Sequence, residues 1–191
     1  MFPLINFLVG IFCKAVFFVK CIGLENLPKE GAVILAANHT SLWDAPVLVP
    51  CIPRKLRAMA KKELFEHKLL KPILVSSGAF PVNRDGNDIG AIKTALKTLK
   101  NGEAFLIFPT GTRVASGETA DAKSGVALIS SRSGAPVIPV AIRGGYRPFH
   151  QVKIYFGEPL TLKVQSGEKA TGEELKGFAD EIMEQIASLG A

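Results

Sequence analysis

The chain has 191 residues, of which 48% are hydrophobic and 21% are charged, and its formal net charge is +6. This length suits one domain with a buried core, and the composition excludes a disordered chain. Three cysteines are too few, and odd in number, for a disulfide scaffold. A polytopic membrane protein is excluded because the sequence has no run of about 20 uncharged apolar residues.

The positive charge is concentrated in the first third of the sequence. Residues 1–71 carry ten Lys and Arg against five Asp and Glu, whereas residues 72–191 carry thirteen against twelve. A basic segment that is also the most apolar one favours an anionic membrane surface as a partner. Nucleic acid is not expected as a partner, because the basic stretch lacks interleaved aromatic residues and zinc-finger or basic-zipper spacing.

Residues 1–24 form a hydrophobic segment whose uncharged run ends at Lys14. A helix of that length would span about 20 Å, less than the roughly 30 Å of a bilayer core. No basic residue precedes Lys14, so a signal peptide is not expected. Two interpretations stay open, namely a helix lying in the membrane interface, with Lys14 and Lys20 reaching the headgroups, or a buried first element. We expect this helix to end near Lys14 and a strand to begin within residues 15–19.

The rest of the chain alternates between apolar runs typical of buried strands and helical spacings of three and four. In chain order we expect a strand at 31–37, a helix at 41–51, a strand at 55–60, a helix at 63–75 interrupted near Pro72, a strand at 79–82, a helix at 88–100, a strand at 104–108, a helix at 124–132, strands at 135–142 and 152–156, and a helix at 171–189 with a capping box from Thr171 to Glu174.

This alternation predicts an α/β fold. We expect a single domain at residues 25–191 with a mostly parallel central sheet flanked by helices, preceded by a hydrophobic membrane-associating segment at residues 1–24.

Two of the predicted strands lead directly into polar clusters, at residues 38–44 and 109–113. Because the carboxyl ends of parallel strands meet at one edge of a sheet, we expect both clusters there. His39 and Asp44 can form a pair in which the carboxylate fixes the imidazole tautomer, if Ser41 caps a helix that begins near Asp44. The alternative is that His39 only ends the strand and Asp44 is favoured by the helix dipole.

Arg84 and Arg113 stand beside Gly-containing turns, where two guanidinium groups would suit a phosphate monoester, although both could be ordinary surface residues. The sequence has no Gly-x-Ser-x-Gly elbow, Walker loop or Gly-x-Gly-x-x-Gly, and no His or Cys spacing typical of a metal site, so no metal or cofactor is expected. His39 is then most simply a general base that acts on a substrate hydroxyl.

Taken together, four blocks resemble the motifs of the 1-acylglycerol-3-phosphate acyltransferase family of glycerolipid acyltransferases. Residues 38–44 (NHTSLWD) are similar to its NHxSxxD motif, residues 78–84 to its second block, residues 108–113 (FPTGTR) to its FPEGTR motif, and residues 137–140 to its fourth block. The resemblance implies acyl transfer from acyl-CoA or acyl carrier protein to the sn-2 hydroxyl of a lysophospholipid acceptor, 1-acylglycerol 3-phosphate, which gives phosphatidate. It also implies a protein at the cytoplasmic face of the membrane, peripheral or anchored by its N-terminus.

The resemblance also implies roles for individual residues. His39 would be the general base, with Asp44 as its orienting carboxylate, and Arg84 and Arg113 would bind the acceptor phosphate. The substrate loops would contain Asn38, Ser41, Thr110, Gly111 and Thr112.

One residue departs from the family pattern, since Thr110 stands where the third block has Glu. Threonine keeps a hydrogen-bonding group but loses the charge. Three alternatives therefore stay open for position 110: another acceptor such as glycerol 3-phosphate, compensation elsewhere in the chain, or a weakened or inactive phospholipid-binding homologue. Apart from this position, an esterase or thioesterase in which His39 activates water is a further alternative.

Overall fold

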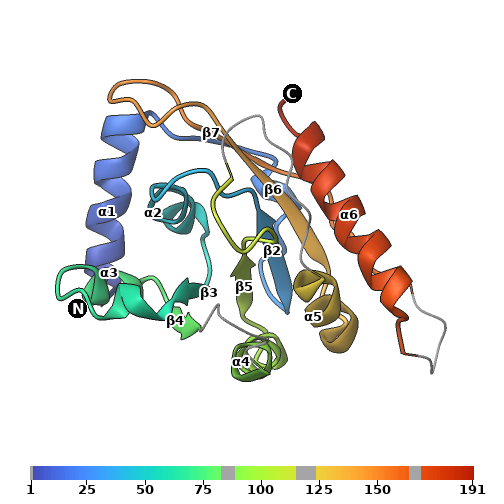
Figure 1. Cartoon of the computed structure of the whole chain (residues 1–191). Helices are drawn as coiled ribbons and strands as arrows, with labels where there is room; N and C mark the ends of the chain where they lie inside the picture. Colours follow the sequence, from blue (N-terminus) through green and yellow to red (C-terminus); the bar gives the residue numbers. More distant parts are fainter. Residues whose placement is uncertain (1, 83–88, 115–123, 164–168) are drawn as a thin grey trace.

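The structure is a computed structural model that describes residues 2–82, 89–114, 124–163 and 169–191. Within these ranges one seven-stranded sheet crosses the molecule (Figure 1). Side by side, its strands are β1 (Lys20–Ile22), β7 (Lys153–Phe156), β6 (Val137–Arg143), β2 (Val33–Ala37), β5 (Ala104–Ile107), β3 (Leu56–Lys61) and β4 (Ala79–Val82). Neighbouring strands are parallel except β6 and β7, which are antiparallel, so the predicted α/β fold with a mostly parallel sheet is confirmed.

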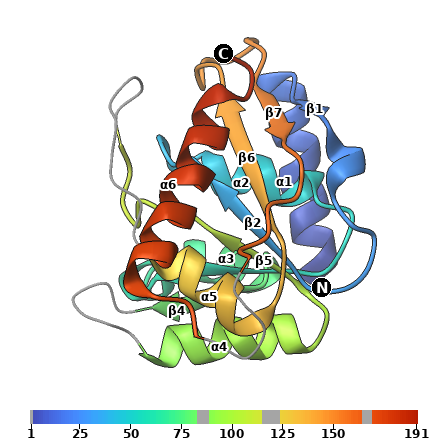
Figure 2. The same cartoon turned by 90° about the vertical axis from the view of Figure 1, so that its right-hand side faces the viewer.

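Helices cover both faces of the sheet (Figures 1 and 2). One face carries α1 (Phe2–Phe17), α2 (Asp44–Leu48), the 3-10 helix η2 (Val49–Cys51) and, beside α1, α3 (Leu70–Ser76). The other face carries α4 (Ile89–Lys100), α5 (Gly125–Ser133) and α6 (Gly172–Ser188). Two further 3-10 helices, η1 (Leu24–Asn26) and η3 (Lys62–Phe65), lie in connections.

The central strand β2 is apolar along its whole length because helices cover it on both sides. Val33 and Leu35 belong to the core beneath α1 and α2, whereas Ile34 and Ala36 belong to the core beneath α4, α5 and α6. A strand without a solvent-facing side has no position that favours a polar residue. The first polar residues after β2 therefore occur where the chain leaves the sheet.

The expected end of the first helix near Lys14 is wrong, because α1 continues to Phe17 and β1 begins only at Lys20. Cys13 and Phe17, four residues apart and so on one side of the helix, are both buried in the core. Their packing outweighs the strand preference of the β-branched and aromatic residues at 15–19. The helix ends at Phe17, and the next residue, Phe18, has a φ of 40°, which lies in the left-handed region.

The expected helix at 41–51 begins later than predicted, since α2 starts at Asp44 and continues into η2. Ser41 does not cap it. The N-cap position is Trp43, and the Ser41 hydroxyl instead accepts a hydrogen bond from the Trp43 N–H at 3.2 Å. The residues before Asp44 therefore form a polar turn outside the helix, which matters for the site described below.

The expected helix at 63–75 is interrupted, but between η3 and α3 rather than near Pro72. Pro72 lies in the first turn of α3, where a missing N–H costs no helical hydrogen bond. The capping box predicted for the last helix is confirmed, because the Thr171 hydroxyl accepts from the Glu174 N–H and the Glu174 carboxylate accepts from the Thr171 N–H.

No helix in the described ranges is long and apolar enough to cross a bilayer. The predicted division of the chain into residues 1–24 and 25–191 stays a prediction. One side of α1 already contributes to the domain core through Cys13 and Phe17. Large side chains on its other side, including Phe7 and Phe12, remain more than half exposed.

Candidate active site

The candidate site lies where three neighbouring strands of the sheet end. His39 follows β2, the loop with Thr110 and Arg113 follows β5, and Tyr146 follows β6. The first two segments are joined directly, because the Val114 N–H donates to the His39 carbonyl at 2.9 Å. The structure thus brings together the two polar clusters that the sequence placed after separate strands.

His39 and Asp44 form a hydrogen-bonded pair. The His39 Nδ1 lies 2.8 Å from the Asp44 Oδ2, and the same oxygen accepts the backbone N–H groups of Thr40 and Ser41, each at 2.7 Å. The Asp44 side chain is fully buried. Because an ionised carboxylate only accepts hydrogen bonds, Nδ1 carries the hydrogen, and the Nε2 of a neutral imidazole is left with its lone pair free.

The turn before α2 explains how residues five apart in sequence can meet. Residues 38–43 are not helical, so Asp44, the first residue of α2, points its carboxylate back into the turn, and the turn wraps its N–H groups around that carboxylate. Asn38 fixes the start of the turn. Its side-chain amide donates to the Ile142 carbonyl at 3.1 Å and accepts the Ile142 N–H at 2.7 Å, which extends the contact between β2 and β6.

The imidazole of His39 is held on a second side by an aromatic ring. Its ring stacks on Phe108 with centroids 4.1 Å apart and an interplanar angle of 20°. The His39 side chain is 13% exposed, so most of it is covered while part remains accessible. A carboxylate and an aromatic face together restrict both the tautomer and the orientation of the ring.

Tyr146 is a site residue that the sequence analysis missed. Its hydroxyl donates a hydrogen bond to the Asp44 Oδ1, the oxygen that does not contact His39. Burial, followed by the negative charge of Asp44, raises the pKa of Tyr146 well above its usual value, so the phenol stays protonated. The signal that could have found it is its place three residues after β6, at the edge where the other two clusters lie.

The loop after β5 begins with buried residues, including Thr110, and continues with exposed ones. The Gly111 N–H donates to the Phe108 carbonyl at 2.9 Å, and the φ of 71° at Gly111 makes the turn that glycine allows. Thr110 is 8% exposed, and its hydroxyl donates to the Thr112 carbonyl at 2.8 Å. The hydroxyl at position 110 therefore closes the loop on itself.

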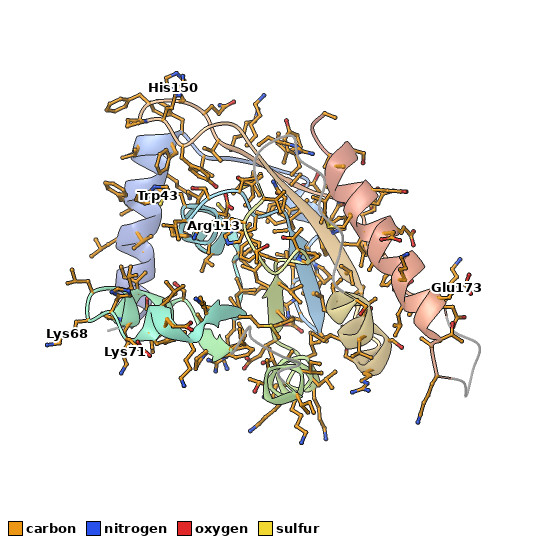
Figure 3. All side chains as sticks on the ribbon, in the orientation of Figure 1. Trp43, Lys68, Lys71, Arg113, His150 and Glu173 are labelled. Carbon is orange, nitrogen blue, oxygen red and sulfur yellow. The ribbon has the colours of Figure 1, made fainter. Side chains whose placement is uncertain are left out.

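Thr112 and Arg113, in contrast, are exposed, and Figure 3 labels the Arg113 side chain on this loop. Arg84, the other guanidinium expected to bind phosphate, lies outside the described residues. Among the residues that the structure describes, no group of three or more His, Cys, Asp or Glu is arranged to hold a metal ion.

Comparisons with known proteins address the same part of the chain. A sequence model of the family described as "Acyltransferase" matches residues 18–143, which include the His39–Asp44 turn and the loop after β5. The chain is 38% identical over 148 residues to a 1-acyl-sn-glycerol-3-phosphate acyltransferase of Bacillus subtilis, a match that covers 74% of this chain and 73% of that protein. It is 31% identical over 173 residues to an enzyme of the same name from Streptococcus pneumoniae, covering 86% of this chain and 60% of that protein.

A solved structure agrees over a longer segment. The crystal structure of the 1-acyl-sn-glycerophosphate acyltransferase PlsC from Thermotoga maritima superimposes with a TM-score of 0.73 at 27% identity. The match covers 100% of this chain and 80% of that one. The similarity therefore extends beyond the four sequence blocks to the arrangement of the whole domain.

Proposed function

The chain belongs to the acyltransferase family, as its four sequence blocks indicated, and from this premise we propose its substrates. The acceptor is a 1-acylglycerol 3-phosphate, the donor is the thioester of acyl-CoA or acyl carrier protein, and the product is phosphatidate. The names of the Bacillus and Streptococcus relatives support this acceptor. The observation that carries the chemistry is the hydrogen bond of 2.8 Å between His39 and a fully buried Asp44.

In the proposed reaction His39 acts as the general base. Its Nε2 takes the proton of the acceptor hydroxyl as the oxygen attacks the thioester carbonyl. The tetrahedral intermediate then expels the thiolate, which recovers the proton from the imidazolium, so one ester bond forms and one thioester bond breaks. Asp44 stabilises the imidazolium and keeps Nδ1 protonated throughout. No covalent bond to the enzyme is needed.

Arg113 is proposed to bind the acceptor phosphate. Replacing it with alanine should raise the KM for the lysophospholipid about 10-fold or more, because charge-assisted hydrogen bonds to a phosphate are lost. The KM for the acyl donor should stay within about twofold, since the donor does not use this contact. Steady-state kinetics with each substrate varied in turn measure both values. Arg132→Ala, an exposed arginine near the end of α5, is the matched control, and an effect confined to the donor KM would contradict the assignment.

The function itself is tested by acyl transfer from a labelled acyl donor to lysophosphatidate in detergent micelles. Labelled phosphatidate from the native protein supports the proposal, whereas labelled free fatty acid without acceptor would indicate a hydrolase. A parallel reaction with glycerol 3-phosphate tests the alternative acceptor. Product formed by Thr110→Glu but not by the native protein would identify a weakened homologue. If neither the native protein nor Thr110→Glu forms product with either acceptor, the result would favour a lipid-binding protein.

The membrane surface is the second part of the proposal, and it is supported by an exposed apolar face around α1. We define this face by its large exposed side chains, which are Phe7, Leu8, Ile11, Phe12, Phe18, Leu42, Trp43, Leu69, Leu70, Val75 and Phe149. Two pairs of these aromatic rings lie close together: Phe12 stacks on Trp43 with centroids 6.3 Å apart, and the Phe18 and Phe149 ring centroids are 6.4 Å apart. Exposed apolar side chains in this number suit contact with lipid.

Positive charge accompanies the apolar face. Lys68 and Lys71 flank Leu69 and Leu70, and Figure 3 shows both lysines projecting beside α3, at the end of α1 where the chain begins. Between α1, η2, β3 and α3 lies a cavity of about 510 Å³, lined by apolar side chains including Phe7 and by Lys14, Arg54, Lys55 and Arg57. Apolar surface bordered by cations matches an anionic bilayer, which we place at the cytoplasmic face of a membrane.

Leu69→Ser tests this contact, because Leu69 is 85% exposed and belongs to the apolar face. The variant should bind vesicles containing an anionic phospholipid about 10-fold more weakly, the loss expected when one large apolar side chain no longer enters lipid. Vesicle sedimentation measures the binding. Ile89→Ser is the matched control, since Ile89 is 63% exposed but lies on α4, on the other face of the sheet. Equal losses in the two variants would contradict the assignment.

A further inference from the structure

The proposed reaction depends on the orientation of Asp44, and the structure shows that both oxygens of this carboxylate are held. Oδ2 faces His39 and two backbone N–H groups, whereas Oδ1 accepts the hydroxyl of Tyr146. We infer that Tyr146 is a positioning residue that locks the Asp44 carboxylate in the orientation in which it holds His39. This inference rests on the proposed general-base function and names a further residue of that same site.

A carboxylate held by one oxygen can still rotate about its Cβ–Cγ bond. A donor on Oδ1 opposes that rotation, because turning the carboxylate would break the bond from Tyr146 in addition to those on Oδ2. Asp44 is completely buried, so water does not readily replace a lost donor. The phenol therefore contributes a constraint that the backbone N–H groups, which contact only Oδ2, do not supply.

The direction of the Tyr146 hydrogen bond is fixed by the charges around it. The ionised carboxylate can only accept, and the raised pKa of Tyr146 keeps its proton in place, so the phenol is always the donor. Donation toward a negative oxygen is a charge-assisted hydrogen bond, which is stronger than one between neutral groups. Tyr146 is thus suited to hold Asp44 without taking part in the proton transfer.

The tyrosine is itself held from two directions. Its ring contacts the Phe17 ring of α1 edge-on, with centroids 5.5 Å apart and an interplanar angle of 83°. The loop that carries it is also bonded to α1, because the Phe149 N–H donates to the Val16 carbonyl at 2.7 Å. At Gly144, where this loop leaves β6, a Cβ atom would lie 2.6 Å from the Gln151 carbonyl oxygen, so the turn requires glycine.

Tyr146→Phe removes only the hydroxyl and keeps the ring on Phe17. We expect kcat to fall about 10-fold while the KM values for donor and acceptor stay within about twofold, because positioning of the base is lost and substrate contacts are not. Tyr155→Phe is the matched control, since Tyr155, the only other tyrosine of the sequence, is partly buried and packs against the core on the opposite face of the sheet. It should retain the native kcat.

A double-mutant cycle separates positioning from a general structural effect. In an Asp44→Asn background, Tyr146→Phe should lower kcat by less than about twofold, because the group on which the tyrosine acts is already gone. If the fall in kcat of the double variant equals the product of the falls in the two single variants, the inference is overturned. A native kcat in the single variant, or an effect on KM alone, would also overturn it.

Proton NMR gives a readout that does not depend on the substrate. The Nδ1 proton of His39 should give a downfield resonance in the native protein, and Tyr146→Phe should broaden it through faster exchange with water. Tyr155→Phe should leave it unchanged. An unchanged resonance in Tyr146→Phe would overturn the inference, whereas absence of acyl transfer by the native protein would count against the proposed function alone.

Discussion

Replacing His39 with glutamine should lower kcat for acyl transfer by about 1,000-fold, the contribution expected of a positioned general base. Glutamine approximates the size of the imidazole and can still hydrogen-bond to the Asp44 carboxylate, but its amide cannot accept the proton of the acceptor hydroxyl. The KM values should change little, because the phosphate contact proposed for Arg113 is intact. Acyl transfer to lysophosphatidate in detergent micelles, measured at saturating donor, gives the comparison.

The two other histidines of the sequence are the natural controls for this result. His67 and His150 are both exposed, and the His150 Nδ1 lies 3.1 Å from the Pro148 carbonyl oxygen. His67→Gln and His150→Gln should therefore keep native kcat values. If His39→Gln retained more than about a tenth of the native kcat, the loss would be too small for a general base and the assignment would be wrong.

Replacing Asp44 with alanine should damage both activity and stability. The substitution leaves the N–H groups of Thr40 and Ser41 and the hydroxyl of Tyr146 without their common acceptor. Loss of one partner from a buried charged network costs about 3 kcal/mol in the free energy of unfolding, which for a chain of this size corresponds to a Tm lower by roughly 10 °C. We also expect kcat to fall by at least about 100-fold, because Nδ1 loses the acceptor that fixes the tautomer.

Asp44→Asn separates the catalytic effect from the structural one. Asparagine keeps the volume and one acceptor oxygen, so the loss of stability should be smaller than in Asp44→Ala, whereas the loss of kcat should be similar because the negative charge is gone. Thermal unfolding and acyl transfer measured on the same preparations provide both values. Asp180→Ala, an exposed carboxylate on α6, should change neither. A native kcat in Asp44→Asn would contradict the role given to the carboxylate.

Much of the architecture could be read from local sequence. The unbroken apolar run of β2 and the helical spacing of apolar residues elsewhere predicted helices on both faces of a parallel sheet. A strand with no polar position must be covered on both of its faces. The polar residues directly after β2 and β5 then marked one edge of that sheet. His39 and Asp44 could be paired from sequence because a turn of five residues closes over a short distance, and family motifs pointed to the same residues.

Packing decided what local preference could not. The helix α1 ends at Phe17 and not near Lys14 as predicted, because burial of Phe17 in the core outweighs the strand preference of its neighbours. The end of α1 does not depend on nearby residues alone, since it follows from the core that surrounds Phe17 after folding. The sequence shows Thr110 only as a departure from the family motif, and the folded chain adds that its hydroxyl donates to the Thr112 carbonyl in the same loop.

Tyr146 shows the difference most clearly. It is 102 residues from Asp44, and its hydroxyl arrives there only because β6 lies beside β2 and α1 holds the loop that follows β6. Sequence by itself determined the chemical groups, the alternation of strands and helices and the family. The tertiary structure alone decided which distant groups surround those residues, because contacts across such a separation depend on the order of strands in the sheet and on the packing of helices over it.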